Sequence, residues 1–315
     1  MPAEQTHALH DASEIDRELD GLDRLEIPVT PPRPLAARLW GGLWPKAAAI
    51  GLVLLIWQVA VWSEWRPEYL LPSPGAVLRR LRDDIGTADL WEAVYHTMRR
   101  AVVGFLIATV IGGVIGLAVS ASRVVRTAIG SMITGLQTMP SIAWFPLAIL
   151  LFGLEDSAIY FVVVLGAAPS IANGLIGGVD AMPPLLRRVG RSMGASRTGL
   201  YRDFVVPAAM PSVVAGLKQG WAFAWRSLMA GELLVVIPGT QTVGTRLSFA
   251  RELVDAEGVI ATMIVILVIG ILVDSLVFSR LERRVLRRRG LGAQQEPPES
   301  KLLRRREQIA AALAR

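Results

Sequence analysis

Apolar residues gather in long runs along the chain, and polar segments separate these runs. The runs cover residues 44–62, 101–121, 127–152, 156–179, 212–237 and 258–279. A hydrocarbon core of ~30 Å requires about twenty apolar residues in a helix that crosses it, so each run predicts a transmembrane helix. The pattern therefore predicts an all-α fold, a polytopic membrane helix bundle with about six transmembrane helices.

Polar segments flank and divide the predicted bundle. Residues 1–43 are acidic and predict a disordered tail, whereas residues 280–315 predict a basic tail. Residues 44–279 form the predicted transmembrane domain, with its core at 96–279 and an Arg-rich segment at 180–211. Residues 75–90, which lie between the first two runs, fit either an interfacial amphipathic helix or a solvated loop.

The distribution of arginine sets the orientation of the chain. If the N-terminus is cytosolic, the arginines at 187–202 and at 280–289 also lie in the cytosol. Basic residues are enriched in cytosolic loops of membrane proteins. We therefore expect both tails and the 180–211 segment to be cytosolic.

Composition narrows the class of protein further. Hydrophobic residues make up 52% of the chain, and the mean hydropathy is +0.45. The chain has no cysteine and only three histidines, so neither a metal site nor Cys-based chemistry is predicted. The net charge of +6 could suit a nucleic acid, but the basic residues flank the apolar runs, which favours the membrane as partner and no nucleic acid.

Small residues recur at every fourth position of the second run. They are Gly104, Ala108, Gly112, Gly116 and Ser120. At helical spacing they form one smooth stripe, which suits either a permeation surface or the close approach of another helix. Tight helix packing is the favoured interpretation.

Charged residues inside the apolar runs mark a candidate substrate path. Arg226 lies near the middle of the fifth run, where a charge costs at least ~2.5–3.5 kcal/mol, so it must face protein or water. Two interpretations stay open, a cation that lines an anion path or a structural ion pair with Asp274. The predicted path comprises Arg226, Trp144, Trp225 and Glu232, with Glu232 offsetting part of the positive field.

Several motifs in the second half of the chain resemble one transporter family. The 180–211 segment contains Ser192-Met-Gly194-Ala-Ser196 and then Phe204-Val-Val-Pro207-Ala-Ala-Met-Pro211. Outside it lie Leu71-Pro-Ser-Pro74, Met139-Pro140-Ser-Ile-Ala-Trp144-Phe-Pro146 and Gly231-Glu232-Leu. Together these stretches resemble the permease subunits of ATP-binding-cassette (ABC) importers of the nitrate/sulfonate/taurine type. One position departs from the family, because Arg188 stands where a glutamate is common.

The resemblance implies that the 180–211 segment couples the permease to an ATPase. A short helix from Leu185 to Met193 would place Leu186, Val189 and Met193 on one apolar face. Gly194 would end this helix in a left-handed conformation, and Ser196 would cap the next turn. The expected coupling residues are Leu186, Arg187, Arg188, Val189, Arg191, Met193, Gly194, Ala195, Ser196 and Pro207.

The resemblance also implies the fold, the partners and the location. It implies the type I ABC importer permease fold, a second permease copy, two cytosolic ATPase subunits and an extracytoplasmic substrate-binding protein in the cell membrane. The chain has no phosphate-loop motif, so it is expected to be non-catalytic and to bind no cofactor, with ATP and Mg held by the ATPase. The expected substrate is a small anion. The alternative is a secondary transporter or channel that works without an ATPase.

Overall fold

The computed structural model describes residues 35–287, and every regular element in that part of the chain is helical. Of the two predicted tails, only residues 35–43 and 280–287 fall within this described range. Within the range, the structure describes the backbone but not the side chains of residues 35–43, Arg187, Arg197, Thr198 and Tyr201. The elements are α2 (Leu35–Trp62), α3 (Pro74–Ile85), α4 (Ala88–Ala121), α5 (Arg123–Thr138), η1 (Ser141–Trp144), α6 (Phe145–Phe152), α7 (Asp156–Asp180), α8 (Pro184–Ser192), α9 (Arg197–Leu200), η2 (Tyr201–Val205), α10 (Val206–Leu234), α11 (Val243–Glu252), α12 (Ala256–Val273), η3 (Asp274–Phe278) and α13 (Ser279–Arg287).

The chain divides into two compact units, Met1–Val59 and Ala60–Arg315. Most of α2 belongs to the first unit, and its apolar part, Trp44–Trp62, matches the first predicted span. α2 begins at Leu35, inside the predicted disordered tail of residues 1–43, and α13 covers the first residues of the predicted basic tail. Hydropathy reports only the apolar part of a helix, and these two helices extend beyond it into polar sequence.

Four unbroken helices of the described region are long and apolar enough to cross a membrane. They lie at Trp44–Trp62, Ala88–Ala121, Asp156–Asp180 and Ala256–Arg287. The third predicted span is a broken one, since α5 and the η1–α6 segment meet at an angle of 104°. Pro140 lies at this break, and proline cannot donate the backbone hydrogen bond that would continue α5.

The predicted fifth span corresponds to α10, which differs from the other spans in polarity. It is 29 residues long, but it carries Lys218, Arg226 and Glu232 and so does not join the apolar set above. Its buried residues include Trp221 and Leu228, which belong to the core. α10 can be less apolar than the other helices because much of its surface contacts protein.

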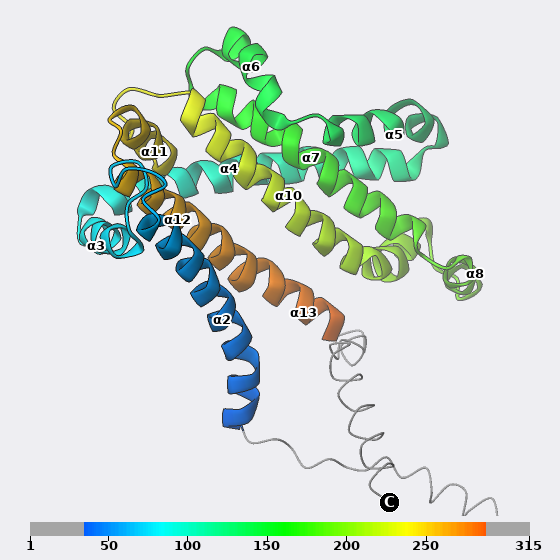
Figure 1. Ribbon diagram of the computed structural model, residues 1–315. Coiled ribbons are helices and arrows are strands. Elements are labelled where there is room, and N and C mark those ends of the chain that lie inside the picture. Colours follow the sequence, from blue (N-terminus) through cyan, green and yellow to red (C-terminus); the bar gives the residue numbers. More distant parts are fainter. Residues whose placement is uncertain (1–34, 288–315) are drawn as a thin grey trace, which may run out of the picture. The chain divides into compact units, whose positions relative to one another are not determined.

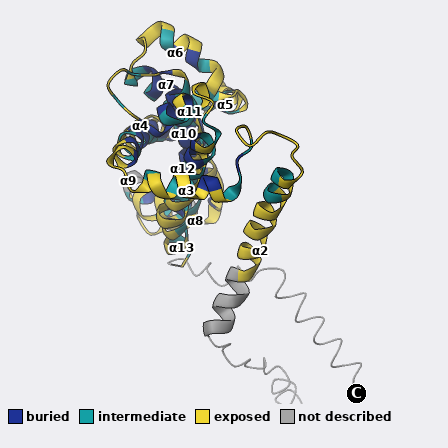
Figure 2. Cartoon of the chain, turned by 60° about the vertical axis from the view of Figure 1, so that its left-hand side comes forward, coloured by how far each residue is buried: buried dark blue, intermediate teal, exposed yellow. Residues whose placement is uncertain are grey.

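The core of the second unit forms where α7 packs against both α4 and α10 (Figure 1). Figure 2 shows the buried residues concentrated on these three helices. Buried side chains from α7, such as Ile159 and Val163, join Ala108 of α4 and Leu228 of α10 in one apolar cluster. These three helices form the frame on which the sites described below are mounted.

Glycine allows the three core helices to approach each other closely. A Cβ on Gly112 would lie 2.5 Å from the carbonyl oxygen of Ala168, so α4 and α7 meet at the stripe predicted from sequence. On the other side of α7, a Cβ on Gly174 would lie 2.6 Å from Cα of Gly216 in α10. The prediction that the stripe serves helix packing is confirmed.

The segment between the first two spans contains a helix, α3, while its predicted place at the membrane interface stays a prediction. Ser73 caps it by accepting a hydrogen bond from the Ala76 N–H at 3.3 Å. Arg80 of α3 pairs with Asp255 at 3.3 Å, and Asp84 pairs with Arg246 at 3.3 Å. The helix is therefore fixed to the ends of α11 and α12 rather than being a free loop.

Candidate functional site

A short helix, α8, stands between the end of α7 and the start of α10 (Figure 1). It covers Pro184–Ser192, one residue earlier at each end than predicted. Gly194 has φ of +76°, its N–H donates to the Arg191 carbonyl at 3.0 Å, and the Ala195 N–H donates to the Gly190 carbonyl at 3.1 Å. This pair of hydrogen bonds defines a Schellman motif, which confirms the predicted helix end at Gly194.

The chain after Gly194 follows the predicted capping pattern. The hydroxyl oxygen of Ser196 accepts a hydrogen bond from the Gly199 N–H at 3.1 Å, as predicted for a cap of the next turn. Ala195 is half-buried between the two helices. Pro207 lies in the first turn of α10, where proline is well tolerated.

One face of α8 is apolar and exposed. Leu186 is 40% exposed, Val189 41% and Met193 73%. Arg188 and Arg191 are exposed as well, whereas the side chain of Arg187 lies outside the described atoms. A soluble segment rarely presents a contiguous apolar face unless a partner covers it.

Beside the apolar face, one side of α8 packs against the following helices. Gly190 is buried, and a Cβ there would lie 2.6 Å from Leu200 and 3.3 Å from Phe204. This position therefore requires a very small residue. A small apolar cluster continues the attachment to α7 and α10, and it consists of Val179, Met182, Val205 and Ala209.

An ion pair ties the start of the 180–211 segment to α5. Both terminal nitrogens of Arg126 lie 2.9 Å from the carboxylate oxygens of Asp180, the last residue of α7. Such a bidentate arrangement fixes direction as well as distance. It links the first turn of α5 to the point where α7 leads into α8.

At its other end, α5 borders a cavity of about 320 Å³. The cavity is lined by residues 136–142, which span the break between α5 and η1, and by Gly166 of α7. Phe223, Arg226 and Ala230 of α10 complete the lining. Of the predicted substrate-path residues, Arg226 is the one that lines this cavity.

The side chain of Arg226 is exposed and held by its own helix. Its Nε–H donates to the Ala222 carbonyl at 3.0 Å, and its guanidinium lies 4.7 Å from the centre of the Phe223 ring. Among the described residues no carboxylate forms an ion pair with it. Asp274, the partner considered from sequence, instead lies 3.8 Å from Nζ of Lys218.

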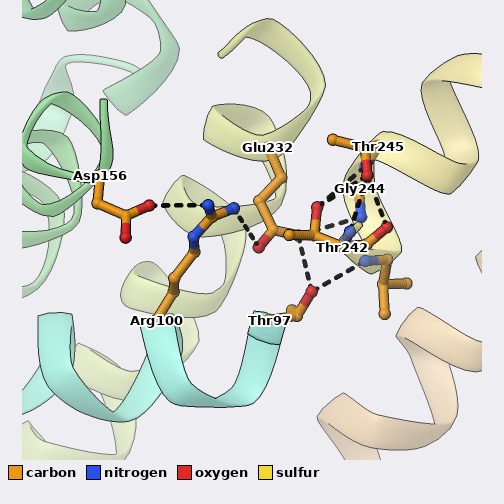
Figure 3. Close-up of polar contacts among 8 residues, drawn as sticks. Thr97, Arg100, Asp156, Glu232, Thr242, Gly244 and Thr245 are labelled. Atoms are coloured by element: carbon orange, nitrogen blue, oxygen red, sulfur yellow. Dashed lines mark hydrogen bonds and ion pairs between the residues drawn. The ribbon is translucent and has the colours of Figure 1, made fainter. Parts of the chain in front are cut away.

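Glu232 lies apart from this cavity, in a buried polar cluster (Figure 3). Its Oε2 accepts hydrogen bonds from the Thr97 hydroxyl at 2.9 Å and from the Gly244 N–H at 3.0 Å. Its Oε1 is 3.5 Å from Arg100, whose other terminal nitrogen is 2.8 Å from Asp156. Glu232 therefore links α4, α7, α10 and α11, and it is not among the residues that line the cavity beside Arg226.

The same cluster holds the first turn of α11. Thr242 and Thr245 form a reciprocal capping box, and the Val243 N–H donates to the Thr97 hydroxyl at 2.9 Å. Sequence reasoning missed Arg100 because it placed this residue in a loop before the second span. The available signal was a pair of opposite charges, Arg100 and Glu232, at the same end of two predicted spans.

The two predicted tryptophans contribute to packing. Trp225 is buried in the core cluster and stacks with Trp221, with ring centres 6.3 Å apart. Trp144 packs against the same cluster from η1. Neither is among the residues that line the cavity beside Arg226.

Comparisons with known proteins agree with this arrangement. Residues 104–287 match the family described as "Binding-protein-dependent transport system inner membrane component". The chain is 26% identical to the taurine transport system permease protein TauC of Escherichia coli over 254 residues, which cover 77% of this chain and 91% of that protein. It is 28% identical to the nitrate import permease protein NrtB of Synechocystis over 238 residues, covering 72% and 84% of the two chains.

A solved structure supports the fold. An inward-facing form of the MetNI methionine ABC transporter matches with a TM-score of 0.53 and 19% identity, over 62% of this chain and 95% of that one. The predicted resemblance to nitrate/sulfonate/taurine permeases and the predicted type I importer fold are thereby confirmed. The chain belongs to the family of binding-protein-dependent transport system inner membrane components.

Proposed function

We propose that this chain is the membrane subunit of an ATP-driven importer for a small anion, and that α8 is where a separate ATPase binds. It is a permease subunit of the inner membrane, as its family is. In the working importer, we expect this chain to assemble with a second copy of itself, with two cytosolic ATPases that hold ATP and Mg, and with an extracytoplasmic binding protein.

The observation that carries the proposal is the exposed apolar face of α8. Leu186, Val189 and Met193 are exposed beside the attached Gly190, and an amphipathic helix of this kind fits a groove on a partner. The neighbouring Arg188 and Arg191 favour acidic groups around that groove. Arg188 replaces the family's usual glutamate, so the charge of the matching ATPase surface is expected to be inverted.

The attachment of α8 explains how movement of an ATPase would reach the membrane. α8 is joined to the end of α7 and the start of α10, which pack on each other. A displacement of α8 would therefore move both core helices together. ATP-driven closure of an ATPase dimer would in this way switch the permease between inward-open and outward-open states.

The substrate class rests on the relatives and on one side chain. Curated relatives are named for taurine, nitrate and aliphatic sulfonates, all of which carry an anionic group. Arg226, with no carboxylate partner among the described residues, supplies a cation at the cavity for such a group.

Reconstitution tests this function. The permease, expressed with a candidate ATPase and a candidate binding protein from the same organism, is expected to purify with the ATPase and to take up an anionic substrate into proteoliposomes only when ATP is supplied. Uptake driven by an ion gradient without ATP would instead establish a secondary transporter.

A pair of variants tests the docking surface. Met193→Asp places a charge on the apolar face of α8 and is expected to abolish co-purification of the ATPase. Leu253→Asp is the matched control, because Leu253 is also apolar and 79% exposed but lies at the end of α11. Equal loss of the ATPase in both variants, or in neither, would contradict the assignment of α8.

A further inference from the structure

The cavity beside Arg226 has an unbalanced set of charges. Among its lining residues Arg226 is the one charged side chain, and no aspartate or glutamate is present. Fixed charges of one sign in a cavity attract the opposite charge and repel their own. A ligand with a cationic group would therefore meet Arg226 without any carboxylate to compensate.

The geometry of Arg226 leaves its two terminal nitrogens available. Nε is engaged by the Ala222 carbonyl, and the face of the guanidinium rests on Phe223. These two contacts fix the orientation of the planar group without using its fork of terminal N–H donors. Such a fork binds the oxygen atoms of a carboxylate, sulfonate or phosphate in parallel.

Polar groups at the helix break add to the same site. Ser141 lines the cavity at the start of η1, where the backbone leaves the α5 helix. Gln137 lines it too, with its amide oriented by a hydrogen bond to Ser170 at 2.8 Å and one from Asn173 at 2.8 Å. Non-helical backbone at membrane depth occurs where it is buried or borders a water-filled cavity, so the break fits a hydrated binding site.

Apart from Thr138, whose hydroxyl donates to the Gly135 carbonyl, the remaining lining is apolar, and the cavity is larger than an inorganic anion requires. Leu136, Met139, Ile142 and Ala230 contribute aliphatic surface. The volume of about 320 Å³ reaches the lower end of the range of pockets that enclose organic ligands, ~300–1,000 Å³. A bare planar anion would leave this apolar surface in contact with water, whereas an alkyl tail would cover it.

From these observations we infer that the cavity binds an organic monoanion with an apolar tail and no ammonium group, of alkanesulfonate chemistry. The inference rests on the proposed function, because it names the substrate class of that importer. Of the three substrates for which the relatives are named, an aliphatic sulfonate fits this cavity, and taurine and nitrate fit it less well. Taurine brings an ammonium group, and nitrate has no tail.

Two ligands of the same size isolate the effect of the ammonium group. Propane-1-sulfonate and taurine share a heavy-atom skeleton and differ by a terminal methyl in place of the ammonium. Binding of radiolabelled propane-1-sulfonate to the purified full-length permease in detergent, without the binding protein, measures the selectivity of the membrane site alone. We expect taurine and nitrate each to compete at least about tenfold less well than unlabelled propane-1-sulfonate, a difference of one factor of ten in the binding constant.

Variants assign the selectivity to residues. Arg226→Gln is expected to weaken propane-1-sulfonate binding by on the order of tenfold to a hundredfold, because hydrogen bonds to a charged group are lost. Ile142→Ala is expected to weaken propane-1-sulfonate binding several-fold and to leave the weaker binding of nitrate unchanged. Arg66→Gln is the matched control, since Arg66 also lies over its neighbouring ring, that of Trp65, but outside the cavity.

The outcomes separate this inference from the proposed function. Equal competition by taurine, undiminished binding in Arg226→Gln, or no saturable binding of any anion would overturn the inference, even if ATP-driven uptake is observed. Selective binding that depends on Arg226 would support it, even if reconstitution shows that transport needs no ATPase. A change in the size-exclusion profile of Arg226→Gln, reversed by Arg226→Lys, would show a structural cation instead and would also overturn it.

Discussion

Replacing Glu232 with glutamine tests whether the buried cluster at the end of α10 holds the helices together. The substitution keeps the shape of the side chain but removes its charge and turns one acceptor into a donor. The carboxylate accepts hydrogen bonds from the Thr97 hydroxyl, the Gly244 N–H and the Arg100 guanidinium. In either orientation the new amide nitrogen therefore faces a buried donor.

The expected loss of stability follows from the burial of this cluster. The side chains of Glu232 and Arg100 are 0% and 5% exposed, so solvent cannot compensate for the lost charge. Breaking a buried ion pair by removing one partner costs about 3–5 kcal/mol. Arg100 keeps its contact with Asp156 at 2.8 Å, which favours the lower end of this range.

Thermal unfolding of the purified permease, followed by tryptophan fluorescence, measures this change. Glu232→Gln is expected to lower the apparent Tm by on the order of 10 °C, at about 2–4 °C per kcal/mol. Glu257→Gln is the control, because Glu257 is exposed and is expected to leave the Tm unchanged. A Glu232→Gln variant that is as stable as the original but does not transport would refute the structural role and return Glu232 to the substrate path.

Three further predictions address coupling and topology. Gly194→Val places a β-branched residue at φ of +76°, at a strain of roughly 1–3 kcal/mol, and is expected to lower uptake per ATP hydrolysed; an unchanged ratio would contradict the coupling role. Arg126→Asp and Asp180→Arg are each expected to reduce uptake while the ATPase stays bound, and the double variant to restore it; failure of the exchange would show that their ion pair does not matter. Reporter fusions after Gly153 are expected outside and after Arg202 inside, and an outside signal at Arg202 would contradict a cytosolic α8.

The helices and their packing could be predicted where the sequence records a local requirement. The stripe in α4 is visible because close backbone contact requires small residues at every helical turn, as at Gly112 and Gly116. The end of α8 is visible because a left-handed residue favours glycine, as at Gly194. In both cases the physical constraint acts on single residues and therefore appears in a single sequence.

Contacts between distant segments were harder to predict. Hydropathy placed the start of the second span at residue 101, whereas α4 begins at Ala88. Arg100 was therefore assigned to a loop, and its contact with Glu232, 132 residues away in the chain, was missed. Pro140 indicated a break in the third span, but the 104° angle depends on how the segments on either side pack and is not encoded at that residue.

The glycine contacts on both sides of α7 have a mechanical consequence. Backbone touches backbone at Gly112 against Ala168 and at Gly174 against Gly216, so at these two points no side chain separates the helices and absorbs a displacement by changing rotamer. A compliant interface of long side chains would dissipate a push at α8 as local rearrangement. The stiff glycine contacts instead transmit a displacement of α8 to α4 and α10, so that the three helices move as a single body. Movement during the transport cycle is then expected at the helix break at Pro140 and at the contacts between the α4–α7–α10 frame and the other helices.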